Sequence, residues 1–217
     1  MMIELKAPVA GPDDATMDAW RAYAMEYLAH ELREAAPKTL GDATRFPHSP
    51  LDGEGAVVVF AFEAVRSDRD AKQFYVVVGR TEPNYYPAHE LSPDEAFSLH
   101  LGTRFMLVMG IAQAEESMVA AYDPSRDART IVDRISPNAP IEDARVAAAF
   151  DVDGQLHAVV SCRLAGRDVF VMAGDAPHGI HERTGLPPQV AYRLHIGQVL
   201  RNEPDPDHTH RPTTPHE

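Results

Sequence analysis

The sequence contains a single cysteine, Cys162, so no disulfide can form within the chain. This cysteine ends the apolar run 158–162, which is typical of a buried strand. No activating motif accompanies it, so we expect a small core residue rather than a reactive thiol. A chain of 217 residues, 44% of them apolar, buries roughly 70% of its unfolded surface on folding. Neither a disulfide nor a metal is therefore needed to stabilise it.

Long hydrophobic runs are also missing. The longest run, 105–112, is far shorter than the roughly 20 residues of a membrane-spanning helix. The N-terminal segment 1–9 has neither the basic region nor the apolar stretch of a secretion or transit signal. We therefore expect a cytoplasmic protein with no membrane partner.

Basic residues are scarce, with 20 lysines and arginines against 33 aspartates and glutamates, a net charge of −13. They form no single patch, and a phosphate backbone would be repelled. Nucleic acid is therefore not an expected partner. The same acidity is compatible with a basic protein partner.

The familiar catalytic signatures are absent as well. The sequence contains no G-x-S-x-G, H-E-x-x-H, Walker A, G-x-G-x-x-G or paired C-x-x-C motif. These absences disfavour hydrolase, nucleotide-binding and redox functions. They do not exclude them, because active sites are often assembled from scattered residues.

Four segments have helical patterns. Apolar residues at 16–36 repeat with helical spacing, and we expect their aromatic side chains to lie in the core. The sequence Ser92-Pro93-Asp94-Glu95 combines a serine cap, an early proline and a capping-box glutamate. The helix that it starts is apolar on nearly every side from 96 to 112, so we expect it to lie between two layers. Further helices are expected at 125–134 and from Pro188 to Asn202.

The remaining apolar segments have strand patterns. A hairpin is expected from 56–65 and 73–78, and three more strands from 146–152, 155–164 and 168–173. Asp153-Gly154 and Ala165-Gly166 have the composition of tight hairpin turns. Segments 41–55, 80–91 and 174–186 are expected to be connections. The predicted class is α+β, with antiparallel sheet or sheets from two related hairpin units packed with helices.

The two halves show signs of an internal duplication. Residues 91–102 align without gaps to residues 186–197, and six of the twelve positions are identical. At the same offset of 95, Gly79 corresponds to Gly174. We therefore predict one domain, 1–202, built from halves of about 14–103 and 104–202 around a pseudo-twofold axis. The Pro- and His-rich segment 203–217 is expected to be a disordered tail.

Several polar residues are candidates for a site. His100 and His195 occupy equivalent positions and would face the pseudo-axis, where they could share a metal, a haem iron or an anion; the alternative is a structural role for each. The loop 175–182, with His178 and His181, has the densest set of potential zinc or iron ligands. The alternative for this loop is a polar surface segment.

A second candidate surface lies in the first half. Tyr85 and Tyr86 are adjacent in a proline-bounded loop that also contains His89. Tyrosines suit a recognition surface because they combine a large area with a hydroxyl group, and they suit equally well the anchoring of a loop to the core.

The expected order of elements is loosely similar to that of the small acidic chaperones of type III secretion and of YbjN-like proteins. The leading hypothesis is a non-catalytic, chaperone-like or adaptor-like protein without a cofactor, which holds a protein or peptide partner on its sheet and on the two loops. One alternative is a zinc- or iron-dependent hydrolase that uses Asp175, His178 and His181. A second alternative is a small-ligand sensor with a cavity between the halves. The apolar central helix would be buried within one chain or between two copies in a homodimer.

Overall fold

The computed structural model describes residues 16–33, 36–47, 51, 56–65, 70–88, 91–182 and 185–202. The chain divides into two compact units. The second unit spans Asp94 to Gln198, and the first comprises the residues before and after it. The expectation of one domain made of two related halves stays a prediction. His89 and the predicted disordered tail lie outside the described residues.

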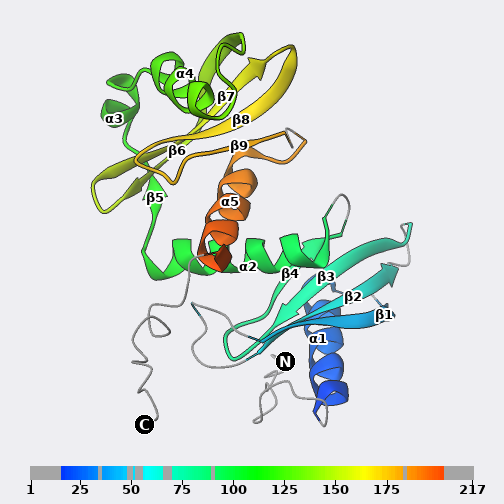
Figure 1. Cartoon of the computed structure of the whole chain (residues 1–217). Coiled ribbons are helices and arrows are strands. Elements are labelled where there is room, and N and C mark those ends of the chain that lie inside the picture. The colour runs from blue at the N-terminus through cyan, green and yellow to red at the C-terminus, as the bar shows by residue number, and fades with distance from the viewer. Residues whose placement is uncertain are drawn as a thin grey trace, which may run out of the picture. The chain divides into compact units, whose positions relative to one another are not determined.

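The first unit contains one helix and a four-stranded antiparallel sheet with the strand order β1-β2-β3-β4. The helix packs on one face of this sheet (Figure 1). Its buried residues recur every four positions along one side of the helix, and they meet alternate residues of the central strands. The elements are α1 (Met17–Leu32), β1 (Ala36–Phe46), β2 (Val57–Val65), β3 (Lys72–Val78) and β4 (Asn84–Pro87).

The second unit is built around a five-stranded antiparallel sheet with the order β5-β6-β7-β8-β9. Its helices are α2 (Pro93–Val108), α3 (Glu116–Ala120), α4 (Pro124–Ile135) and α5 (Pro188–Asn202), the last residues of which belong to the first unit. Its strands are β5 (Ala112–Gln113), β6 (Ile141–Val152), β7 (Gln155–Leu164), β8 (Arg167–Gly174) and β9 (Gly179–His181). Along the chain, therefore, one helix precedes and another follows each run of four consecutive antiparallel strands, β1 to β4 and β6 to β9.

Helices cover the two faces of the second sheet. On one face, Ile131 and Val132 of α4 pack in a core cluster with Val160 of β7. On the other face, Tyr192 of α5 stacks on Phe150 with the ring centroids 4.3 Å apart. No helix of the described segments is both long and apolar enough to cross a membrane.

Helices α2 and α5 cross at two glycines. A Cβ atom at Gly102 would overlap the carbonyl oxygen of Arg193, and one at Gly197 would overlap the carbonyl oxygen of Ser98. The contact is reciprocal. Gly102 packs against Arg193, which lies four residues before Gly197 on α5, and Gly197 packs against Ser98, which lies four residues before Gly102 on α2. Ser98 and Arg193 are also equivalent in the alignment of 91–102 with 186–197. A pseudo-twofold axis predicts a contact of this kind, although the duplication itself stays a prediction.

The hairpin turns form as the sequence predicts. Asp153 and Gly154 have φ angles of 51° and 81°, and Ala165 and Gly166 have φ angles of 48° and 81°. Two consecutive positive values are the signature of a type I′ turn, whose twist matches that of the flanking strands. The helix starts at Pro93 and Pro188 and the short helix after Pro124 are also where the sequence places them.

The prediction of three long connections is wrong, because each contains a strand. β1 extends through Phe46 into the segment expected to be irregular, and β4 and β9 lie within the two predicted loops. The sequence of β1 includes Lys38, Gly41 and Asp42, which are poor strand formers. All three strands pair with a strongly apolar neighbour, so the sheet rather than local propensity determines their conformation.

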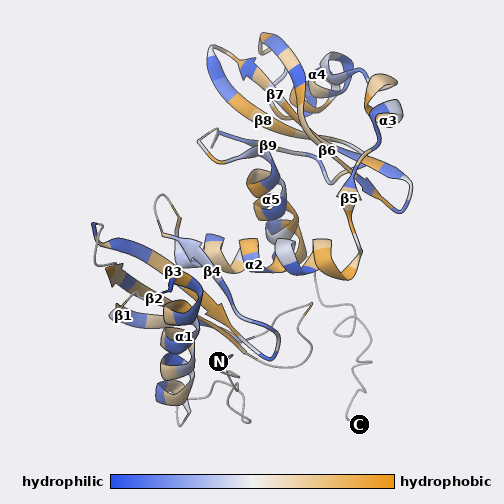
Figure 2. Ribbon diagram, turned by 180° about the vertical axis from the view of Figure 1, so that it is seen from behind, coloured by the Kyte–Doolittle hydropathy of each residue, from blue (hydrophilic) through white to orange (hydrophobic). Residues whose placement is uncertain are grey.

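The central helix is shorter and less buried than expected. It ends at Val108, and Gly110 follows with a φ of 61°. Complete burial is limited to residues 96–102, whereas Leu107 and Val108 are 66% and 63% exposed. Figure 2 shows this hydrophobic C-terminal end of α2. The expectation that the helix is buried on all sides as far as residue 112 is therefore wrong.

Candidate functional site

The two tyrosines of the first unit lie on β4. Tyr85 packs against the core cluster beneath α1, with its ring centroid 6.3 Å from that of Tyr27 and 6.1 Å from that of Phe74. Tyr86 lies opposite Tyr75 on β3 and is partly buried. Tyr85 therefore anchors β4 to the core, and a recognition role for this pair stays a prediction.

The two equivalent histidines have different surroundings. His100 is completely buried in α2. His195, 7% exposed on α5, lies against His181 of β9, with 2.9 Å between His195 Nδ1 and His181 Nε2. The second ring nitrogen of His195, Nε2, lies 2.7 Å from the carbonyl oxygen of Pro177. The structure thus brings together two of the predicted site residues from different elements.

The hydrogen bonds assign the protons of this imidazole pair. A carbonyl oxygen only accepts, so Nε2 of His195 donates to Pro177. In the neutral ring Nδ1 of His195 is then an acceptor, and Nε2 of His181 donates to it. Gly179 leaves the space for this ring, because a Cβ atom there would lie 2.5 Å from His195 Cε1.

Both imidazoles are held neutral. Burial, followed by the proximity of His195, lowers the pKa of His181 to about 4. Burial also lowers the pKa of His195, although the bond to the Pro177 carbonyl opposes the effect. Desolvation favours the uncharged ring in each case, so the pair forms a neutral link between β9 and α5 near pH 7.

A third imidazole lies under the same helix. His157 Nδ1 is 2.7 Å from the hydroxyl of Tyr192, and both residues are buried. Burial lowers the pKa of His157, while the charge of Asp175 opposes the shift. Burial also raises the pKa of Tyr192, so its hydroxyl stays protonated and donates to the neutral ring. This bond satisfies two polar groups that would otherwise be buried without partners.

We expect Tyr192→Phe to lower the free energy of unfolding by about 1 to 2 kcal/mol, because His157 loses its buried donor. Urea unfolding followed by circular dichroism measures the change. The matched variant Tyr75→Phe removes a hydroxyl from the partly buried Tyr75 and should change stability by less than about 0.5 kcal/mol. Equal losses in the two variants would show that the bond to His157 contributes nothing.

The predicted metal-binding loop does not gather its donors. Asp175 accepts a hydrogen bond from the backbone N–H of Leu156 at 3.0 Å. His178 is exposed and lies 3.4 Å from both Arg134 and the carbonyl of Gly174, and the other histidine of the loop pairs with the imidazole on α5. Among the residues that the structure describes, no three His, Cys, Asp or Glu side chains converge as metal ligands.

Comparison of the chain with protein-family models, curated proteins and solved structures finds no match. Its function therefore has to be inferred from its own geometry.

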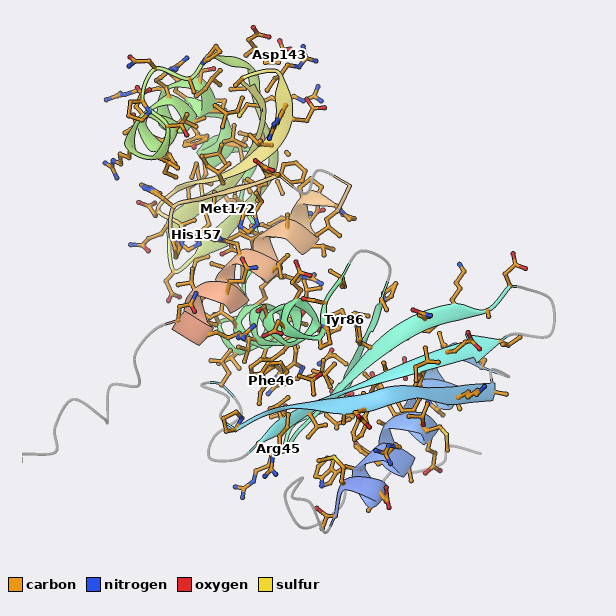
Figure 3. The ribbon with its side chains drawn as sticks, turned by 45° about the vertical axis from the view of Figure 1, so that its right-hand side comes forward. Arg45, Phe46, Tyr86, Asp143, His157 and Met172 are labelled. Carbon is orange, nitrogen blue, oxygen red and sulfur yellow. The ribbon has the colours of Figure 1, made fainter. Side chains whose placement is uncertain are left out.

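The second unit also contains a groove that no sequence motif indicated. A groove of about 850 Å³ lies over β6, β7 and β8. Figure 3 shows Asp143 at the end of the sheet remote from His157 and Met172, which lie near α5. The lining residues are Asp143, Ala144, Arg145, Ala147, Ser161, Cys162, Arg163, Asp168, Val169, Phe170 and Pro188.

Strand register identifies the groove floor. Arg145 lies opposite Ser161, and Ser161 lies opposite Phe170. These residues share a face of the sheet with His157, because side chains of β7 alternate and 157 and 161 are an even number of residues apart. The groove therefore lies on the face of the sheet that α5 packs against. It begins at Pro188, the N-terminal residue of α5, and covers the part of this face that the helix leaves open.

A bulge in β6 places Arg145 on this floor. Glu142 pairs with Arg163 and Arg145 pairs with Ser161, so two residues, Asp143 and Ala144, oppose a single residue of β7. In a regular strand, Ala144 would occupy the position opposite Ser161, and Arg145 would point to the other face. Asp143 adopts a φ of 56° at this bulge. Such a register change could not be predicted from the alternation of the sequence, which indicated a strand only from residue 146.

The charges of the groove are unevenly matched. Arg163 lies 3.9 Å from Glu142 and 3.8 Å from Asp168, and both carboxylates are largely exposed. Arg145 instead donates from Nε to the hydroxyl of Ser161 at 3.3 Å. The positive charge of Arg163 is thus offset by its neighbours, whereas that of Arg145 faces a neutral hydroxyl.

A smaller hollow of about 230 Å³ adjoins the groove at Ala147, which lines both. It follows the outer edge of β6 between Val146 and Phe150. Strand β5 pairs with only Phe150 and Asp151, and the N–H of Ala114 donates to the carbonyl of the preceding Ala149. The β6 edge from 141 to 148 has no strand partner in the described part of the chain.

Proposed function

We propose that the chain is a non-catalytic binding protein that holds an extended segment of a protein partner in the groove of its second sheet. The observation behind this proposal is that the groove meets the outer edge of β6, which lacks a strand partner among the described residues, at one place, Ala147. A sheet edge offers backbone hydrogen bonds to an extended chain, and flanking hollows accept its alternate side chains.

The shape of the site favours a segment over a compact ligand. Sites for small molecules enclose 70–90% of a ligand, typically within about 300–1,000 Å³. Here a second hollow adjoins the groove at Ala147, along a sheet edge. An elongated occupant fills both spaces, which is why a small-ligand sensor is not our preferred function.

The groove lacks an activated nucleophile. Ser161 accepts a hydrogen bond from a guanidinium, which does not take up its proton. Burial raises the pKa of the Cys162 thiol, which keeps the sulfur protonated and unreactive. None of the described residues that line the groove is a histidine. A binding role therefore fits these residues better than covalent catalysis does.

Random 12-residue peptides displayed on phage provide a direct test against the full chain. We expect enriched peptides, once synthesised, to bind with micromolar dissociation constants. They should shift the backbone amide resonances of Arg145, Ser161 and Phe170 in the labelled protein. The proposal fails if no peptide is enriched, or if the shifts lie away from the groove.

A matched pair of variants sharpens this test. Ala147→Gln places a longer side chain where the two hollows meet and should weaken binding at least tenfold. Thr130→Gln also introduces a glutamine, on the exposed side of α4, and should leave binding within twofold. Equal affinities for the two variants would place the peptide elsewhere.

A further inference from the structure

Building on the proposed peptide-binding function, we infer that the groove recognises a carboxylate of its partner through Arg145 and Ser161. The occupant is an extended segment with either an acidic side chain or a free C-terminus at this position. Both sources offer the same planar anion, and the experiment below distinguishes between them.

The first argument is the β6 bulge. It interrupts the ladder between Glu142 and Arg145, and its effect on the side chains is to turn Arg145 onto the groove floor. Bulges commonly reorient a side chain beside a binding site. The long arginine stem lies next to Ser161, whose hydroxyl orients the guanidinium through Nε.

The second argument is the hydrogen-bonding capacity that remains on Arg145. A guanidinium has five N–H groups, and one of them is used in the bond from Nε to Ser161. Within the described residues Arg145 makes no ion pair, whereas Arg163 lies between two carboxylates. The terminal amino groups of Arg145 match the two oxygens of a carboxylate, a geometry that adds both strength and specificity.

The third argument is the local field. Pro188, the first residue of α5, lines the groove, and the first turn of this helix contains no acidic residue. The partial positive charge of a helix N-terminus favours an anion nearby. Asp143 lines the same groove and opposes the anion through its own charge. Arg145 should therefore raise the affinity for a carboxylate, and Asp143 should lower it.

The probes are peptides selected from the phage library and then synthesised in three forms: unchanged, with each Asp or Glu replaced by its amide, and with an amidated C-terminus. We expect neutralisation of the carboxylate that Arg145 binds to weaken the affinity of the peptide at least tenfold. A loss in the second form identifies a side chain, and a loss in the third identifies the C-terminus.

Variants of the full chain test the protein side. Arg145→Gln should weaken binding of the unchanged peptide at least tenfold. The affinity of Arg145→Lys should lie between those of the unmodified chain and of Arg145→Gln, because an ammonium group keeps the charge but cannot form the paired hydrogen bonds. Asp143→Asn should tighten binding two- to fivefold. Arg126→Gln is the matched control on α4 and should stay within twofold, since Arg126 is exposed and α4 covers the opposite face.

The outcomes separate the two proposals. If peptides shift the groove amides but Arg145→Gln and the amide forms bind within twofold of the originals, carboxylate recognition is wrong and groove binding stands. If no peptide binds in the groove, both proposals fail. If the amide NMR spectrum of Arg145→Gln shows that this variant is misfolded, the three peptide forms and the Asp143→Asn variant still test carboxylate recognition.

Discussion

Gly197→Ala is expected to destabilise the protein by about 3 kcal/mol or more. Alanine normally stabilises a helix by about 1 kcal/mol relative to glycine, so the expected effect has the opposite sign. The reason is steric, because the added Cβ overlaps the backbone carbonyl of Ser98 on α2. A backbone atom cannot move aside as the end of a flexible side chain can, and overpacking in a closely packed interior costs about 1 to 3 kcal/mol or more. Urea unfolding of the full chain measures the change.

Two further variants test whether the crossing is the cause. Gly102→Ala should produce a similar loss, because its Cβ meets the Arg193 carbonyl in the reciprocal contact. Gln198→Ala, at the adjacent and partly exposed position of α5, should change stability by less than about 0.5 kcal/mol. If Gly197→Ala stabilises the protein, the close approach of α2 and α5 is wrong.

The double variant Gly102→Ala with Gly197→Ala adds information about symmetry. Substitutions that act on one contact are not independent, so their effects should not add. Once the first alanine has pushed the helices apart, the second meets less resistance. A combined loss well below the sum of the single losses would show that both glycines serve one crossing.

Turn and cap chemistry made the central elements of the fold predictable from sequence. Asp153-Gly154 and Ala165-Gly166 indicate tight turns by residue type, and Pro93 follows a capping serine. These signals are local, so they do not depend on the rest of the fold. β1, β4 and β9 have no such signal, because their conformation comes from pairing with neighbours distant in sequence. Local propensity therefore predicted connections where the sheets impose strands.

The candidate site was predictable only in part. The sequence singles out His181 and His195, but the equivalent positions of His100 and His195 predict that these two form the pair. The structure places His195 beside His181 instead, through the short strand β9 that the sequence did not reveal. The groove was missed because a bulge determines which face Arg145 occupies. The available signal was the polar pair Ser161 and Arg163, two residues apart in an apolar strand.

Acidification is expected to destabilise the second unit through the His181–His195 pair. An unfolded histidine has a pKa near 6.5, whereas burial lowers that of His181 to about 4 in the folded chain. The folded state thus disfavours protonation, and the stability that depends on the neutral ring is fully present above pH 6.5. It is lost as the pH falls from about 6.5 to about 4. A shift of this size corresponds to about 3 kcal/mol, and solvent screening at the partly exposed ring reduces it to about 2.

Protonation also has a geometric consequence. A proton on Nδ1 of His195 would face the N–H of His181, so one of the bonds between β9 and α5 would be broken. The free energy of unfolding measured in urea at intervals between pH 7 and pH 4 should therefore decline. In the variant His181→Gln the decline should be smaller by about 2 kcal/mol, because the most strongly shifted imidazole is gone.

His178→Gln is the matched control, because His178 belongs to the same loop and is exposed. Its pH profile should parallel that of the unmodified chain. The ring protons of His181 also report its titration directly by NMR. A midpoint near 6.5 for His181 would mean that the ring is exposed to solvent in the folded state and takes up its proton as readily as in the unfolded chain. The neutral link between β9 and α5 would then be wrong, whatever the urea data show.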